Sequence, residues 1–172
     1  GYPFCRGRVF DICEKDVGQY DDEAEIFWAS GAAMFVRASC FKSSGGFDEY
    51  LFAHQEEIDL CWRWKNEGKK VFAQPQSLVY HLGGGSLAAG TTRKVFLNFR
   101  NNLVVMHKNL IAKNRKQVIY KRMLLDGLAG FRFLIQGRLS LFFAVIRAHI
   151  SYYKWRRNAE PSNKPKFKLP SH

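Results

Sequence analysis

The segment HQEEIDLCWRW, residues 54–64, constrains the fold of this chain most, because it places three carboxylates beside two tryptophans. At about 100° per residue, a helix over this segment gathers its apolar side chains on one broad arc. Glu56 and Asp59 fall on the opposite, polar arc. Glu57 falls within the apolar arc, where a carboxylate is out of place. The pattern therefore predicts an amphipathic helix over residues 55–67 with one acid on its apolar side.

Two interpretations of these acids stay open when only the residues are considered. Acids in the first turn of a helix are favoured by the positive end of the helix dipole, and Asp59 and Arg63 have the i, i+4 spacing of an ion pair. This capping interpretation explains Glu56 and Asp59, but it does not explain Glu57. A desolvated carboxylate has a raised pKa and is a better general base. The alternative is therefore that Glu57 is catalytic.

Charge is divided unevenly along the 172 residues, whose net charge is +12. Residues 1–92 have a balance of −4, and residues 93–172 have a balance of +16. An apolar fraction of 47% excludes a disordered chain. Four scattered cysteines without a C-x-x-C pair exclude zinc spacing and indicate reduced thiols in a cytosolic setting. The basic half predicts an anionic partner.

The patterns of the remaining chain predict its elements and boundaries. Residues 26–37 have the pattern of a buried strand and residues 38–42 that of a short helix, and Gly68 is expected to end the helix over residues 55–67. Extended segments are expected at 70–73 and 77–82, and long helices at 96–110, 117–136 and 139–155. These elements divide the chain into three parts: 1–92, a helical extension at 93–157, and a disordered basic tail at 158–172.

The basic helical half has three possible roles: a solvated face, a nucleic-acid-binding surface or a membrane-binding surface. Charge runs are usually solvated faces, and no recognised nucleic-acid fingerprint is present, so nucleic acid is not expected. None of the helices is a convincing membrane span, because a span needs about 20 mostly apolar residues. Wide apolar arcs with aromatic residues beside Lys and Arg favour the third account, in which the helices lie on an anionic membrane surface.

A histidine followed by a glycine-rich loop, HLGGGS, ends the first part of the chain. A lone histidine is more often structural than a ligand. Backbone N–H groups of such a loop, which includes Gly84, Gly85 and Ser86, approach phosphate oxygens closely. A neutral imidazole at His81 is suited to a divalent metal or a phosphate. A simple flexible turn is the alternative.

The order of the motifs closely resembles family 2 glycosyltransferases. It runs S-G-A, G-G-F-D-E, F-A-H-x-E-E-I-D-L-C-W-R and P-x-S-x-V-Y-H-x-G-G-G-S, from about Tyr2 to Asn109. The resemblance implies an α/β GT-A (Rossmann-like) fold and inverting transfer of a sugar from a nucleotide-sugar donor. The helices that follow are similar to the family's C-terminal extension.

The resemblance also implies roles for residues. Glu57 matches the second acid of the family's pair, the catalytic base, although the family more often has Asp there. Asp59 matches an acid that orients the helix or contacts acceptor hydroxyls, and His81 matches the ligand of the donor's Mn²⁺ or Mg²⁺. With Glu56 as the first acid, the substrate-binding candidates are Gly31, Ala32, Trp62, Trp64, Arg63, Gly84, Gly85 and Ser86. For the tryptophans, core packing is the alternative to stacking on a sugar ring.

One departure from the family's pattern is large. The Asp-x-Asp metal motif of the nucleotide-binding half is absent from this chain. The chain thus resembles the C-terminal portion of the enzyme and is expected to be inactive alone. The expected whole enzyme transfers sugar to a glycan or lipid-linked acceptor in cell-envelope polysaccharide biosynthesis, in the cytoplasm and peripherally on the inner face of the cell membrane. The alternative is a non-catalytic module that binds membrane or polyanion.

Overall fold

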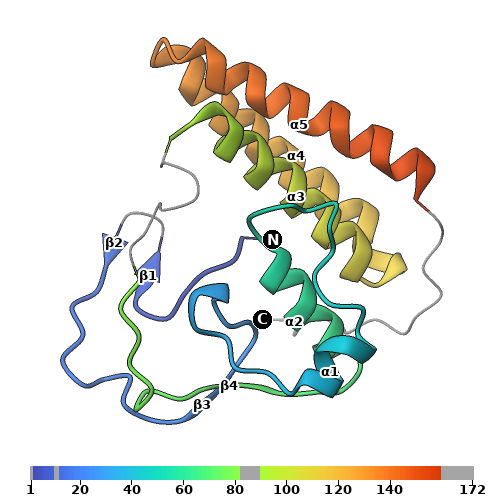
Figure 1. Cartoon of the computed structure of the whole chain (residues 1–172). Coiled ribbons are helices and arrows are strands. Elements are labelled where there is room, and N and C mark those ends of the chain that lie inside the picture. Colours follow the sequence, from blue (N-terminus) through green and yellow to red (C-terminus); the bar gives the residue numbers. More distant parts are fainter. Residues whose placement is uncertain (1, 10–11, 82–89, 160–172) are drawn as a thin grey trace.

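The computed structural model describes residues 2–9, 12–81 and 90–159 as a mixed α/β arrangement that is mostly helical. The strands form two small antiparallel pairs: β1 (Arg8–Val9) with β2 (Ile12–Cys13), and β3 (Ala24–Ile26) with β4 (Val71–Ala73). The helices are η1 (Gly31–Ala33), α1 (Ala38–Ser43), α2 (Glu56–Asn66), α3 (Thr92–Asn109), α4 (Ala112–Ile135) and α5 (Leu139–Asn158). In Figure 1, α3, α4 and α5 form a bundle, and α2 lies against α3 on the side of the strands.

Helix α2 confirms the predicted amphipathic helix. It spans Glu56–Asn66, and Gly68 follows with a φ of +76°, a left-handed value that glycine adopts without a steric penalty. One apolar cluster forms where α2 meets the bundle, around Ile58 and Trp62 of α2 and Leu103 of α3. A second cluster contains Leu60, Cys61 and Trp64, which pack toward the strands. Helix α2 is therefore packed on two sides, against the bundle and toward the strands.

The three long helices are confirmed, with changed ends. The first begins four residues earlier than predicted, at Thr92, because the Thr91 hydroxyl caps it by accepting a hydrogen bond from the Lys94 amide at 3.4 Å. The second begins at Ala112 rather than at residue 117, and the third ends at Asn158. Among the described residues, no helix has the length and hydropathy needed to cross a membrane. The predicted disordered tail lies outside the described residues from residue 160 onward.

The predicted long strand over residues 26–37 is wrong. Only Ala24–Ile26 form a strand, paired with Val71–Ala73, and the chain then turns into the 3-10 helix η1. The side chain of Ser30 caps this turn by accepting a hydrogen bond from the Ala32 amide at 3.3 Å. Apolar composition alone did not reveal that only three residues find a partner strand. Residues 77–81, also predicted to be extended, form no strand.

Candidate active site

Glu57 lies in the first turn of α2 with one carboxylate oxygen enclosed and unsatisfied. Its Oε2 is buried and has no hydrogen-bond partner, and the same holds for Oε2 of Glu56. Burial raises the pKa of Glu57 above its ordinary value of 4.5, and the neighbouring charge of Glu56 raises it further. A half-buried carboxylate with a free oxygen and a raised pKa has the properties of a general base.

The turn that follows β3 lies beside this acid. A Cβ atom placed on Gly31 would be 3.8 Å from the Cβ of Glu57, which is ordinary van der Waals contact. Gly31 and Ala32, predicted to line an acceptor pocket, are therefore on the turn next to Glu57, and both line the open pocket described below. Their part in substrate binding stays a prediction.

The chain reaches the acid pair through an unusual backbone. Phe52, His54 and Gln55 have φ values of 62°, 68° and 71°, so three of the four residues before Glu56 are left-handed without being glycine. A left-handed residue with a Cβ costs about 1–2 kcal/mol. Such a run persists only where the surroundings over-determine it, and strained backbone of this kind clusters at functional sites.

Side chains of helix α3 hold this left-handed backbone through hydrogen bonds. The buried Asn101 side chain donates from Nδ2 to the carbonyl oxygens of Leu51, Ala53 and His54, at 2.9, 2.9 and 2.8 Å. Arg100 donates to the carbonyls of Tyr50 and Leu51 at 2.9 and 3.2 Å. The loop before the catalytic candidate is therefore held by side chains about fifty residues away in sequence.

His54 is a site residue that the sequence analysis missed. Its Nε2 atom is buried and unsatisfied, like the oxygens of Glu56 and Glu57. Burial lowers the pKa of His54, and the positive charge of Lys94 lowers it further, which favours the neutral imidazole. His54, Glu56 and Glu57, each with a buried polar atom that has no hydrogen-bond partner, thus lie where the chain enters α2. The sequence feature that could have indicated a role for His54 is its position two residues before the acid pair.

Asp59 lies on the polar arc of α2, as predicted, but that arc is buried at this position. Its side chain is 0% exposed and accepts hydrogen bonds from Arg63 at 2.9 Å, Lys108 at 2.9 Å and Asn109 at 2.8 Å. The predicted ion pair with Arg63 is confirmed. The polar arc is buried here because the end of α3 brings Lys108 and Asn109 against it.

The donors of Arg63 are also engaged within the protein. Besides Asp59, its guanidinium donates to the carbonyl oxygens of Ser44 and Gly46. These contacts tie α2 to the turn after α1. The structure thus gives Asp59 and Arg63 architectural partners, and contact with substrate stays a prediction for both.

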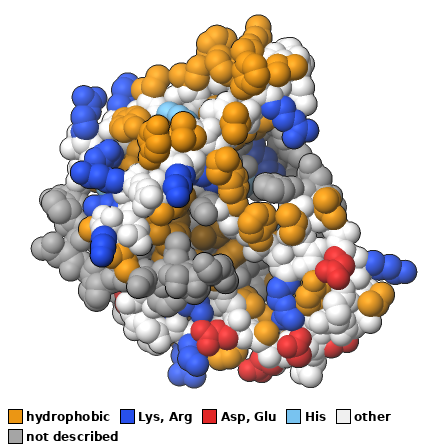
Figure 2. All heavy atoms as spheres, turned by 180° about the vertical axis from the view of Figure 1, so that it is seen from behind, with side chains coloured by type: hydrophobic (Ala, Val, Ile, Leu, Met, Phe, Trp, Pro, Cys, Tyr) orange, Lys and Arg blue, Asp and Glu red, His pale blue; other side chains and the backbone are white. Residues whose placement is uncertain are grey.

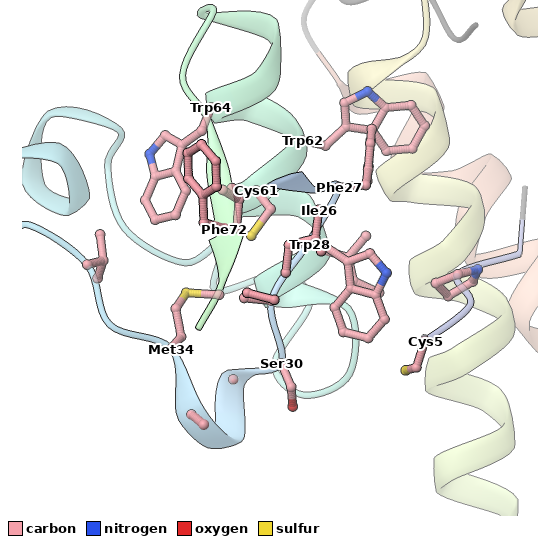
Figure 3. Close-up of a pocket in the computed structure, with 18 of the residues that line it drawn as sticks. Cys5, Ile26, Phe27, Trp28, Ser30, Met34, Cys61, Trp62, Trp64 and Phe72 are labelled. Atoms are coloured by element: carbon pink, nitrogen blue, oxygen red, sulfur yellow. The ribbon is translucent and has the colours of Figure 1, made fainter. Parts of the chain in front are cut away.

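Trp62 and Trp64 leave α2 in opposite directions (Figure 3). Trp62 is 7% exposed and packs edge-to-face on Phe27, with 5.4 Å between ring centroids. Trp64 is 6% exposed and donates from Nε1 to Ser44 Oγ at 2.6 Å. Core packing, the alternative interpretation, accounts for most of both indoles.

An open pocket of about 1880 Å³ lies between α2, the strands and the turn after β3 (Figure 3). Parts of both indoles line it, together with Ile26, Trp28 and Met34. Its lining is largely apolar, with Ser30 and Gln55 among the polar residues. A predominantly apolar concavity with few polar groups is the usual form of a ligand site.

The predicted metal site does not take shape in the described residues. His81 is exposed, and no group of three His, Cys, Asp or Glu side chains is arranged to hold a metal ion within residues 2–9, 12–81 and 90–159. The described residues therefore do not by themselves fit a bound divalent ion. Gly84, Gly85 and Ser86 lie outside the described residues.

Comparison with curated proteins finds partial relatives that are glycosyltransferases. The chain is 32% identical over 85 residues to a "Pre-mycofactocin glycosyltransferase" of Mycobacterium tuberculosis, which is 47% of this chain and 18% of that protein. It is 37% identical over 59 residues to an "N-acetylglucosaminyl-diphospho-decaprenol L-rhamnosyltransferase" of the same organism, covering 34% of this chain and 19% of that one. It is 36% identical over 56 residues to "Rhamnosyltransferase WbbL" of Escherichia coli, covering 33% and 21%.

These matches extend over only part of each protein. The chain spans about a fifth of the length of the curated relatives it matches. No protein-family model matches the chain. No solved structure matches it either. The comparisons thus relate the chain to glycosyltransferases in general, without assigning a family or a fold type.

Proposed function

We propose that this chain is the acceptor side of a family 2, GT-A glycosyltransferase and that Glu57 is its general base. The observation that carries the proposal is the buried Oε2 of Glu57, which has no hydrogen-bond partner. Glu57 closely follows a strained loop, and its Cβ lies beside Gly31. The names of the partial relatives support the reaction class. In the proposed fold, the nucleotide-binding half lies outside this chain.

The proposed reaction is a single displacement. Glu57 removes the proton from an acceptor hydroxyl as its oxygen attacks the anomeric carbon of the donor sugar. The bond from that carbon to the nucleoside diphosphate breaks on the opposite face, and the diphosphate leaves with the bonding electrons. The configuration at carbon is inverted, and one proton has moved from the acceptor to Glu57.

The remaining residues take supporting parts in this proposal. The neutral His54 is suited to hydrogen bonding with an acceptor hydroxyl, because its buried Nε2 has no protein partner. Glu56 keeps the pKa of Glu57 high through its charge. A divalent metal near His81 rests on the family resemblance alone, and no step above depends on it.

A nucleotide-sugar assay tests the proposal. The longest protein that contains this chain is incubated with a panel of nucleotide sugars, with Mn²⁺, Mg²⁺ or chelator, and with glycan and lipid-diphosphate acceptors. We expect nucleoside diphosphate release that depends on one donor and increases with acceptor. The N-acetylglucosaminyl-diphospho-decaprenol relative makes a lipid-linked sugar diphosphate the first acceptor to test. Turnover equal to that of Glu57→Gln across the panel would favour the non-catalytic binding module.

We also propose that the enzyme works at an anionic membrane surface, with α4 and α5 in contact with lipid. The sides of these helices that face away from the bundle are apolar, which reverses the usual pattern of a helix in a water-soluble protein. On α4, the exposed residues recur at spacings of three or four: Tyr120, Leu124, Leu128, Phe131 and Ile135. On α5 they are Leu139, Phe143, Ile146, Ile150 and Tyr153.

Charge complementarity favours lipid as the partner of this face. The only acid between residues 112 and 158 is Asp126, which is 0% exposed, whereas basic side chains such as Lys121, Arg147 and Lys154 are exposed. Figure 2 shows hydrophobic side chains with Lys and Arg over the upper part of the molecule, where Figure 1 places these helices, and acids at the lower end. Apolar insertion flanked by cations is typical of interfacial helices. A peripheral position on the inner, cytoplasmic face of the cell membrane follows as part of the proposal.

We expect the chain to co-sediment with vesicles that contain acidic lipid at low salt, and to do so much less at high salt. Each Lys or Arg near such a surface contributes about 1 kcal/mol, and this attraction is screened within a Debye length. Phe131→Ser combined with Phe143→Ser should weaken binding by at least tenfold, because burying each ring contributes about 1.5–3 kcal/mol. Phe35→Ser, which changes a fully exposed ring outside this face, is the matched control. Negligible binding of the unaltered chain to acidic and neutral vesicles alike would refute the membrane proposal.

A further inference from the structure

The run Arg100-Asn101-Asn102 on α3 holds the loop that leads into the acid pair. Arg100 and Asn101 donate to four backbone carbonyls between Tyr50 and His54. Asn102 Nδ2 donates to the side-chain oxygen of Gln55 at 3.4 Å, and Gln55 Nε2 donates to the backbone carbonyl of Asn98 at 3.2 Å. Phe52 is the one residue of 50–55 without such a bond to α3.

Asn101 is the centre of this arrangement. Its side chain is 0% exposed, and its Nδ2 group, with two hydrogens, faces three carbonyl oxygens of one short segment. Its Oδ1 atom accepts from Arg100 Nε at 2.9 Å, which fixes the orientation of the amide. The three carbonyls belong to a segment in which Phe52 and His54 have a left-handed backbone.

This geometry differs from that of an asparagine that serves its own helix. Asn109, near the end of α3, donates to the carbonyl of Val105 within the helix at 3.0 Å as well as to Asp59. The acceptors of Asn101 Nδ2 all lie 47 to 50 residues away in sequence. The hydrogen bonds of Asn101 are therefore directed at the loop.

We propose that Asn101 is a positioning residue that keeps Phe52, His54 and Gln55 in their left-handed backbone and so fixes where Glu57 presents its carboxylate. It acts through the loop backbone and touches no reacting atom. Without its amide, the cost of leaving buried carbonyls unpaired and the strain of three positive φ values both favour a relaxed loop. A relaxed loop would move the first turn of α2 and admit water to the acid. The effect of Asn101 on catalysis rests on the proposed function, but its effect on the loop backbone does not.

A buried chain of polar contacts fixes α3 in turn. Asn102 Oδ1 accepts from Arg122 Nη1 at 2.6 Å, and Arg122 Nε pairs with Asp126 at 2.6 Å. Asp126 also lies 3.2 Å from Nε2 of His149 on α5. The loop, α3, α4 and α5 are thereby connected through side chains that are mostly buried. The bundle thus serves as the rigid support of the proposed positioning device.

The test is a ¹³C NMR titration of the Glu57 carboxyl, assigned with Glu57→Gln, on the chain itself. In Asn101→Ala we expect the raised pKa of Glu57 to fall measurably toward its ordinary value, because its oxygen becomes hydrated. Glu56, whose charge also raises this pKa, is present in both proteins. The matched control is Asn98→Ala, which removes an asparagine side chain from the same helix and keeps the backbone carbonyl that Gln55 uses. This control should leave the pKa of Glu57 unchanged.

A folded Asn101→Ala protein with an unchanged Glu57 pKa would overturn the proposal. Should Asn101→Ala fail to fold, Gln55→Ala decides, because it removes two side-chain bonds to α3 and leaves the core intact. A lower Glu57 pKa in Gln55→Ala then supports loop positioning, and an unchanged value refutes it. In an active enzyme, Asn101→Ala should lower kcat more than it changes KM. If Glu57→Gln leaves turnover intact, the proposed function fails while the pKa result on Asn101 still stands.

Discussion

We expect Glu57→Gln to lower the turnover of the proposed glycosyltransferase by about 10²–10⁴-fold, the usual contribution of general acid–base catalysis. The substitution keeps the size of the side chain and removes the proton acceptor. Substrate binding should change little, so the loss should appear in kcat and not in KM. Steady-state kinetics at saturating donor and acceptor measure it. Near-normal turnover would return the acids of α2 to the helix-capping interpretation.

Two controls separate chemistry from folding in this experiment. Glu56→Gln removes the neighbouring acid and should cost less turnover, because Glu56 only raises the pKa of Glu57 in the proposed reaction. Glu57→Gln should also unfold at an equal or higher denaturant concentration than the unaltered protein at neutral pH. A desolvated carboxylate without a partner opposes folding, and the amide removes that charge.

The pH dependence follows from the same raised pKa. A carboxyl group whose pKa is higher in the folded state binds its proton more tightly there than in the unfolded chain. Its contribution therefore favours folding less as the pH rises from the ordinary value of 4.5 through the raised value of Glu57. Activity should increase as the pH rises over the same interval, because the base accepts a proton only when it is ionised. Glu57→Gln should abolish both dependences in this interval.

The properties of Glu57 were predictable because they arise from local periodicity. One helical projection places this acid among apolar residues, and burial of that arc raises its pKa without any distant partner. The same projection did not show that Asp59 is buried, because Lys108 and Asn109 approach α2 from α3 and cover its polar arc. Helical periodicity identifies the faces of a helix, but it does not identify which neighbours cover them.

The loop before α2 and the turn after β3 show a second limit to what the sequence predicts. The local composition of FAHQ does not indicate three positive φ values, since His is the one residue of the four that is enriched in a left-handed backbone. Asn101, whose side chain donates to the carbonyls of this loop, is 47 to 50 residues away in sequence. The strand predicted over residues 26–37 failed similarly, because strand length depends on a partner strand and not on apolar composition.

The largest loss of stability is expected for Asp59→Ala, about 3–5 kcal/mol in the free energy of unfolding. Asp59 is fully buried and is the shared acceptor of Arg63, Lys108 and Asn109. Its removal takes the carboxylate away from Arg63 and leaves Lys108 paired with Asp48 at 2.6 Å. Urea denaturation followed by tryptophan fluorescence measures this loss, because Trp62 and Trp64 lie on the same helix.

A surface ion pair is the matched control for this prediction. Glu25 pairs with Lys65 at 2.7 Å and Lys70 at 3.3 Å, but its side chain is 41% exposed, so Glu25→Ala should cost no more than about 1 kcal/mol. If Asp59→Ala is too unstable to purify, Asp59→Asn keeps the shape and removes only the charge. A cost below that of Glu25→Ala for either variant would show that α2 is held on α3 by apolar packing alone. The predicted result instead makes Asp59 the residue that joins α2 to α3, two residues after the proposed base Glu57.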